Sequence, residues 1–140
     1  MSFAPVSEAE AFLAAHPEVR LVEAFLIDAN GVPRGKLLHR DELLAAYHHG
    51  RPLPASILGL TINGEDVPET GLVWDVGDAD CWTFPLAGSL VLQPWRHKPT
   101  AQLQLAMHPD KGLPAAVADP RRVLERVIAQ LALDGLHPVM

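Results

Sequence analysis

The sequence predicts an α+β fold in which a mixed or antiparallel sheet of about five strands is packed against helices. Short apolar runs bounded by turn residues predict the strands, and three other segments combine helix-end residues with helical apolar spacing. The length of 140 residues allows one hydrophobic core. With 49% hydrophobic and 20% charged residues, the composition is typical of a globular chain and excludes a disordered chain or a coiled coil.

The first two predicted helices are short, and each has recognisable end signals. The first, over residues 7–15, begins with Ser7 and Glu10 in the spacing of a capping box. Asp41 is expected as the N-cap of the second helix, and Gly50 is expected just after its last residue. These signals place one helix before and one helix after the first pair of strands.

The third predicted helix opens with Asp119 as its N-cap and Pro120 as its first helical residue, and it ends before Gly135. We expect its apolar stripe to be buried under the sheet. The stripe consists of Val123, Leu124, Val127, Ile128 and Leu131. The residues after Gly135 resemble the start of a further strand that lacks room to finish, so we expect the chain to be a piece of a longer protein.

The apolar runs predict strands over residues 19–27, 34–39, 55–62, 89–95 and 101–107. The first run is apolar on nearly both faces, as expected of an internal strand, whereas the last alternates and is expected to have one face in water. Asn30 and Gly31 supply the positive φ angles that a tight hairpin turn needs between the first two strands. The polar segment 63–71 is a loop long enough to be functional.

Charge and cysteine content exclude several classes of partner. Eleven Lys and Arg residues against 17 Asp and Glu residues give a net charge of −6, without a basic run, which argues against nucleic acid as a partner. The N-terminus lacks the basic region of a secretion signal, and no uncharged apolar run reaches the roughly 18 residues of a membrane span. The single cysteine, Cys81, forms no intrachain disulfide, so we expect a cytoplasmic protein.

No motif for self-contained chemistry is present. The seven histidines include no pair at i, i+4 spacing on a predicted helix, and the glycines form no phosphate-binding loop. Asp75, Asp78 and Asp80 are expected to be turn carboxylates rather than a calcium site, because the glycine and distal glutamate of an EF-hand are missing. Cys81 is expected to be structural, since its acidic neighbour disfavours a thiolate. We therefore expect no catalytic, cofactor-binding or metal-ligating residue in this chain.

Four short motifs give a more specific indication when they are taken in order. They are residues 26–36 (LIDANGVPRGK), 78–85 (DADCWTFP), 93–95 (QPW) and 118–124 (ADPRRVL). Together they resemble the N-terminal, β-grasp-like domain of the glutamine synthetase family, especially its γ-glutamylpolyamine synthetase-like branch. The resemblance implies an N-terminal helical segment (residues 1–18), a β-grasp-like domain (residues 19–118), and a connecting helix with the start of a missing catalytic domain (residues 119–140).

The resemblance also implies the activity of the longer protein. The family consists of ATP-dependent carbon–nitrogen ligases of nitrogen metabolism, including glutamine biosynthesis. Glutamate is converted to γ-glutamyl phosphate, which ammonia or an amine then attacks, with Mg or Mn ions neutralising the phosphates. The ATP and metal sites are expected in the missing catalytic domain, so this chain alone is not expected to be an enzyme. Its expected partners are its own catalytic domain and the neighbouring subunits of a homo-oligomeric ring.

The candidate binding residues follow from the same resemblance. In the family, the N-terminal domain completes the active site of a neighbouring subunit through a loop whose aspartate helps to bind ammonium. The resemblance places Thr61 at the position of that aspartate, which puts specificity for ammonia in doubt. Asn63, Glu65 and Asp66 are further candidate substrate-binding residues of this loop. The alternative is that Thr61 is an ordinary strand residue and that Glu65 or Asp66 supplies the charge.

Two other functions remain open on the sequence alone. One is a free-standing β-grasp interaction module without catalysis. The other is a small cytoplasmic enzyme that acts alone, which would need a pocket with perturbed titratable groups. If the ring ligase is correct, Leu58 and Leu60 are expected to be partly uncovered in this chain and to promote weak self-association.

Overall fold

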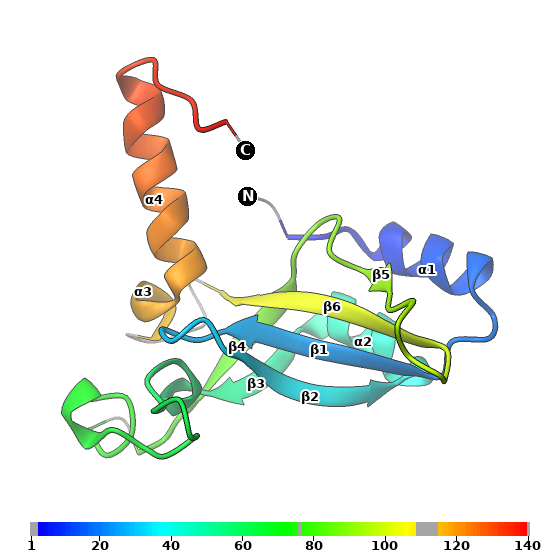
Figure 1. The fold of residues 1–140 in the computed structure, drawn as a ribbon, viewed down its shortest axis with the longest axis horizontal. Helices are drawn as coiled ribbons and strands as arrows, with labels where there is room; N and C mark the ends of the chain where they lie inside the picture. Colours follow the sequence, from blue (N-terminus) through cyan, green and yellow to red (C-terminus); the bar gives the residue numbers. More distant parts are fainter. Residues whose placement is uncertain (1–2, 76, 109–114, 140) are drawn as a thin grey trace.

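A mixed six-stranded sheet with helices against one face forms the body of the molecule (Figure 1). The computed structural model describes residues 3–75, 77–108 and 115–139. The helices are α1 (Val6–Ala15), α2 (Leu43–His49), α3 (Ala115–Ala118) and α4 (Pro120–Leu133), with 3-10 turns η1 (Arg40–Glu42), η2 (Ala55–Leu58) and η3 (Pro68–Thr70). The strands are β1 (Leu21–Ile27), β2 (Pro33–His39), β3 (Arg51–Pro54), β4 (Asp80–Pro85), β5 (Val91–Leu92) and β6 (Thr100–Met107). The predicted α+β, β-grasp-like class is confirmed.

The strand order is β2-β1-β6-β4-β3, and the short β5 pairs with β6. Strands β1 and β2 form the predicted antiparallel hairpin, and Gly31 in its turn has a positive φ angle (77°) as predicted. The positive φ angle predicted for Asn30 is wrong, because among the described residues other than glycine only Asp78 has one. Strand β1 then runs parallel to β6, so the first and last strands of the sheet lie side by side. Strand β1 is therefore internal, as its apolar composition predicts.

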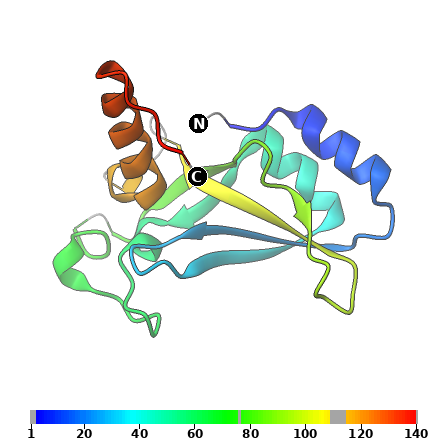
Figure 2. The ribbon, with the colours of Figure 1, turned by 45° about the horizontal axis from the view of Figure 1, so that its top comes forward.

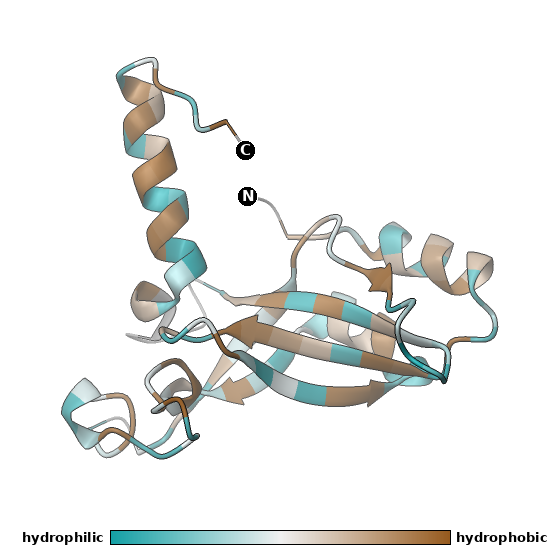
Figure 3. Cartoon of the chain, in the orientation of Figure 1, coloured by the Kyte–Doolittle hydropathy of each residue, from teal (hydrophilic) through white to brown (hydrophobic). Residues whose placement is uncertain are grey.

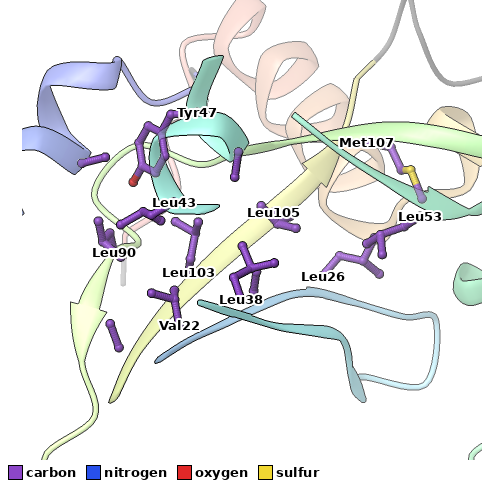
Figure 4. Close-up of a cluster of buried hydrophobic side chains, with 14 of the residues drawn as sticks. Val22, Leu26, Leu38, Leu43, Tyr47, Leu53, Leu90, Leu103, Leu105 and Met107 are labelled. Atoms are coloured by element: carbon purple, nitrogen blue, oxygen red, sulfur yellow. The ribbon is translucent and has the colours of Figure 1, made fainter. Parts of the chain in front are cut away.

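The hydrophobic core lies between the sheet and helices α1 and α2 (Figure 2). Along β1, the buried Val22, Ala24 and Leu26 alternate with half-buried residues of the opposite face. Figure 4 shows the larger core side chains, which include Leu38, Leu103 and Leu105 of the sheet and Leu43 and Tyr47 of α2. Burial of one such leucine contributes about 1.5–3 kcal/mol, so this cluster is a main source of stability.

Strand β6 is buried along most of its length, so the predicted water-facing side is confirmed only in part. Gln102 and Gln104 do alternate with apolar residues, but both are half-buried. The hydroxyl of Ser89 donates to the backbone carbonyl of Gln104 (3.2 Å), and Gln102 lines a groove on this side of the strand. This side of β6 is therefore neither fully exposed nor fully buried.

Helix α1 is capped by a distant residue rather than by its own sequence. Pro5 occupies the N-cap position and no side chain caps this end, so the predicted capping box of Ser7 and Glu10 is wrong, since both lie inside the helix. At the other end, the guanidinium of Arg40 donates to carbonyl oxygens of the last turn and beyond it, including that of Leu13 (2.6 Å). These bonds satisfy carbonyls that have no partner within the helix.

The start of α2 also differs from the prediction. The turn η1 precedes it, and there His39 and Glu42 form a capping box, so Asp41 lies within η1 and is not the N-cap. The predicted end is confirmed, because Gly50 follows the last helical residue with a φ angle of 72°. Glycine adopts this conformation without the strain that a side chain would add.

The segment predicted as a strand over residues 55–62 forms no strand. Strand β3 comes earlier and pairs with β4 at the edge of the sheet, where Pro52 and Pro54 are tolerated. The chain then turns into η2 and a loop. The strand predicted over residues 89–95 is reduced to the two residues of β5. Cys81 lies buried in β4, as predicted.

Helix α4 projects from the sheet instead of packing under it (Figure 1), and its apolar bands run along an uncovered helix (Figure 3). Val123, Leu124 and Val127 are 42%, 51% and 50% exposed, while Ile128 and Leu131 are half-buried. The predicted burial of this stripe is therefore wrong. Among the described residues, no helix combines the length and the apolar character that crossing a membrane requires.

Candidate functional site

Two segments that are distant in the sequence meet at one end of the sheet (Figure 1). One is the β1–β2 turn, residues 28–32. The other begins at the last residue of η2 and spans residues 58–66, and we call it the 58–66 loop. The loop contains all the residues predicted to bind substrate, which are Thr61, Asn63, Glu65 and Asp66. The four predicted residues, which are close in the sequence, therefore lie on one short loop beside the β1–β2 hairpin.

The 58–66 loop closes on itself through Thr61. The backbone N–H of Thr61 donates to the carbonyl oxygen of Glu65 (2.9 Å), and its own carbonyl oxygen accepts from the N–H of Gly64 (2.9 Å). The hydroxyl oxygen of Thr61 accepts from the N–H of Glu65 (3.1 Å). Thr61 is thus a loop residue and not the strand residue of the alternative, and its side chain helps to shape the loop.

The remaining candidate side chains stand free of the protein body. Asn63, Glu65 and Asp66 are exposed. Within residues 3–75, 77–108 and 115–139, no hydrogen bond or ion pair engages any of these three side chains. Two carboxylates and one amide are therefore free to contact a ligand or a second protein at this end of the sheet.

The β1–β2 hairpin holds the loop through two side chains, Asn30 of the turn and Arg34 near the start of β2. The amide nitrogen Nδ2 of Asn30 donates to the carbonyl oxygen of Leu60 (2.7 Å). The guanidinium nitrogen Nη2 of Arg34 donates to the carbonyl oxygens of Thr61 (2.8 Å) and Ile62 (3.3 Å). The loop backbone is therefore fixed by residues about 30 positions earlier in the chain.

Asp28 anchors this arrangement from beneath. Its side chain is fully buried and accepts hydrogen bonds from the N–H groups of Asn30 and Val32 (both 2.8 Å) and from Nε of Arg34 (2.9 Å). Burial acts to raise the pKa of Asp28, but the bonds from Val32, Arg34 and Asn30 outweigh it and hold the pKa below its ordinary value. The sequence alone marks Asp28 only as a residue of the turn, although Asp28 and Arg34 both lie in the 26–36 motif.

The start of the loop, next to η2, is anchored by a side-chain hydrogen bond. Ser56 of η2 donates through its hydroxyl to Oδ1 of Asp78 (2.7 Å), and Asp78 has a φ angle of 48°, which is uncommon for a residue other than glycine. Leu58 is buried, so its predicted exposure is wrong, whereas Leu60 is half-buried. The start of the loop is thus held in place, and residues 62–66 are exposed.

A groove of about 560 Å³ lies elsewhere, on the face of the sheet opposite the core. Its lining includes Phe25, Leu37 and Trp95, of which Leu37 is 56% and Trp95 65% exposed. Glu23 on the same face accepts a hydrogen bond from Nε2 of Gln93 (2.7 Å) and is also paired with Arg96. This face therefore combines an uncovered apolar area with a carboxylate that is paired with an arginine.

The structure gathers no metal-binding cluster in the part of the chain that it describes. No group of three or more His, Cys, Asp or Glu side chains there is placed to hold a metal ion. Asp78, one of the acidic residues weighed for calcium, instead fixes the turn through Ser56. The described residues therefore offer no site for the metal ions that the family resemblance implies.

The comparison with known sequences gives one curated relative with a clear match. No known family model matches the chain. Gamma-glutamylputrescine synthetase PuuA from Escherichia coli is 34% identical over 133 residues, which is 95% of this chain and 28% of PuuA. The chain thus spans about a quarter of the length of this relative.

Solved structures of related enzymes share the fold of this chain. A GmaS/ADP complex superposes with a TM-score of 0.62 at 22% identity, over 89% of this chain and 25% of GmaS. A glutamine synthetase from Plasmodium falciparum superposes with a TM-score of 0.67 at 17% identity, over 96% of this chain and 24% of that enzyme. These structures establish the fold, and together with the sequence match they confirm the resemblance that the four motifs indicate.

Proposed function

We propose that this chain, a relative of the glutamine synthetase family, is the N-terminal domain of an ATP-dependent ligase that joins glutamate to ammonia or an amine. The carrying observation is the 34% identity with gamma-glutamylputrescine synthetase over 133 residues. The domain would contribute the 58–66 loop to the active site of a neighbouring subunit. Its own residues would bind and orient the incoming amine, while the rest of the enzyme carries out phosphoryl transfer.

The geometry of the 58–66 loop supports a role in binding the incoming amine. Its backbone is held by Asn30 and Arg34, and its tip presents Glu65 and Asp66 to solvent. Exposed carboxylates on a fixed backbone favour a cationic ligand, and an amine with an ammonium group fits that charge. The same tip would sit at the edge of a site that another subunit completes.

Two uncovered apolar surfaces support the expected protein partners. The stripe of α4, centred on Leu124, lies outside the core, and Leu37 and Trp95 are exposed on the outer face of the sheet. Monomeric proteins rarely leave large contiguous apolar patches in water. We propose that the catalytic domain of the same chain and a neighbouring subunit cover these surfaces in a homo-oligomeric ring.

The reaction implied by the resemblance divides into two steps. The γ-carboxylate of glutamate attacks the terminal phosphorus of ATP, which releases ADP and leaves γ-glutamyl phosphate. The bound ammonium group then loses a proton, the neutral amine nitrogen attacks the acyl carbon, phosphate leaves, and the nitrogen loses a second proton as the amide forms. ATP and Mg or Mn ions would be bound by residues outside this chain, because the described residues contain no suitable ligand cluster. We assign no covalent step to residues 1–140.

The test uses the full natural chain. Purified protein should release phosphate from ATP in a manner that depends on both glutamate and an amine, whereas the 140-residue chain alone should not. Absence of any such ligation by the full chain would contradict the proposal and favour a free-standing β-grasp interaction module.

A mixing experiment tests the shared active site. One full-length variant carries Glu65→Gln and Asp66→Asn, and the other has a metal-binding carboxylate of the catalytic domain replaced. Each should be impaired alone, and reassembled mixtures should regain activity, because some sites would combine an intact loop with an intact catalytic domain. Mixtures no more active than the average of the two variants would place the loop outside the neighbouring site.

A further inference from the structure

We infer that Arg34 is the positioning residue that sets the shape of the 58–66 loop for the incoming amine. The inference rests on the proposed function for its role towards substrate. Arg34 bonds to backbone carbonyl oxygens of the loop, and we assign it no contact with substrate. Its action is through the loop backbone.

The guanidinium of Arg34 joins three groups that belong to two segments. Its Nε is 2.9 Å from Oδ2 of Asp28, and its Nη2 is 2.8 Å from the carbonyl oxygen of Thr61 and 3.3 Å from that of Ile62. The side chain is 18% exposed, so water competes little for these bonds. A planar guanidinium makes these bonds from separate nitrogens held in a fixed plane, whereas a lysine must make all its bonds from one nitrogen.

Asp28 fixes the direction in which the guanidinium points. Its carboxylate is fully buried and is held by two backbone N–H groups of the β1–β2 turn, so it is part of a rigid element. A buried carboxylate needs a charged partner close by, and Arg34 is that partner. The arginine therefore cannot turn away without leaving Asp28 uncompensated.

The loop depends on this contact because the bonds of Thr61 with Gly64 and Glu65 close the loop on itself without tying it to the hairpin. The side chains of Asn63, Glu65 and Asp66 make no bond within the described ranges, so the bonds from Asn30 and Arg34 to loop carbonyls tie residues 60–62 to the hairpin. The tip also packs closely on the guanidinium, since a Cβ atom at Gly64 would lie 3.3 Å from Nη1 of Arg34. A change at position 34 is therefore transmitted to the residues at the tip.

This geometry predicts which kinetic parameter changes. A shift of about 1 Å in a binding group can lower activity by about a hundredfold even when the altered residue is remote from the chemistry. Since the loop is proposed to bind the amine, its displacement should raise the KM for the amine. The KM values for ATP and glutamate should be nearly unchanged, because those substrates would bind elsewhere.

The experiment compares Arg34→Gln, Arg34→Lys and Asn30→Ala in the full natural chain. Asn30→Ala removes only the bond to Leu60 and leaves the buried pair intact, so it remains informative if Arg34→Gln fails to fold. The matched control is Arg51→Gln, because Arg51 pairs with Glu42 and makes no hydrogen bond to the loop through its side chain in the described structure. Hydrogen exchange of residues 60–66 and the KM for each substrate are measured for all four variants.

The expected result is faster exchange in the loop for Arg34→Gln and a KM for the amine raised by about tenfold. Arg34→Lys should recover only part of the effect, Asn30→Ala should show a smaller one, and Arg51→Gln should behave like the wild type. Faster exchange without a change in the amine KM would overturn the positioning role and leave the proposed function standing. Unchanged exchange would overturn the inference directly.

A third outcome separates this inference from the proposed function. If the full chain shows no ligation with any amine, the proposed function fails, and the role of Arg34 towards substrate fails with it. The exchange data would then still decide whether Arg34 holds the loop.

Discussion

The carboxylate of Asp119 accepts a hydrogen bond from the backbone N–H of Met107 (2.9 Å), and this bond ties the start of α4 to the end of β6. Its second oxygen accepts from the N–H of Arg121 (2.9 Å) and caps the helix. Nε of Arg122 donates to the carbonyl oxygen of Met107 (3.0 Å), so both backbone groups of one residue are used. The helix is thereby clamped at its base while its apolar stripe extends outward.

Replacement of Asp119 should destabilise the chain. Asp119→Ala removes a helix cap and leaves the buried N–H of Met107 without its acceptor, so we expect a loss of about 2–3 kcal/mol. Asp119→Asn keeps one oxygen and should lose about half as much. Urea unfolding measures both. Equal and negligible losses would show that the clamp does not stabilise the fold.

The exposure of α4 predicts an asymmetry between two leucines. Leu103→Ala, in the core, should cost about 2–5 kcal/mol, whereas Leu124→Ala, on a side chain that is 51% exposed, should cost less than about 1 kcal/mol. Leu124→Glu should also reduce self-association of this chain, measured by sedimentation velocity. Similar unfolding costs for the two alanine variants would mean that α4 packs against the sheet in solution.

The pH dependence of stability should report on Asp28. The pKa of Asp28 is lowered in the folded state. The ionised carboxylate therefore stabilises the fold fully above the pKa of the unfolded chain, about 3.9, and this stabilisation is lost as the pH falls through the folded-state pKa. The stability difference between wild type and Asp28→Asn should therefore be constant near neutral pH and shrink in acid. Urea unfolding of both proteins between about pH 2 and pH 7 measures it. A difference that is independent of pH would contradict the lowered pKa.

Two glycines of the hairpin should respond differently to substitution. Gly31 has a φ angle of 77° and open space around it, so Gly31→Val should cost about 1–2 kcal/mol through backbone strain alone, and Gly31→Asn should cost less. At Gly35, a Cβ atom would lie 1.9 Å from the carbonyl oxygen of Ala24, so Gly35→Ala should lower the Tm more than Gly31→Ala. Thermal unfolding compares them, and the reverse order would contradict the register of β1 and β2.

Substitution of Thr61 tests its proposed place in the amine site. An aspartate can still accept the N–H of Glu65 that the Thr61 hydroxyl accepts, so the loop should survive Thr61→Asp. The added charge should raise kcat/KM for ammonia relative to a primary amine by about tenfold, equivalent to about 1.4 kcal/mol in the full natural chain. Thr61→Asn is the uncharged control. If the ratio moves no more than in that control, Thr61 lies outside the substrate site.

The sequence by itself determines the features that depend on neighbouring residues. Gly31 predicts the hairpin because glycine readily adopts the positive φ angle of a tight turn, and Asp119 with Pro120 predicts the start of α4 because both act within one helical turn. The inward side of β1 follows from the alternation of its apolar residues. The four motifs also indicate the family, because their order and spacing can be read directly from the sequence.

Features that depend on partners distant in the sequence can be seen only in the folded structure. The end of α1 is capped by Arg40 rather than by a local signal, and residues 55–62 form a turn and a loop because β3 takes the edge position beside β4. The stripe of α4 is as apolar as a buried one, but the clamp at Asp119 directs it away from the sheet. Arg34 meets Thr61 across 27 positions of the chain. Local propensity cannot specify such contacts, because their free energy arises only when the whole sheet has formed.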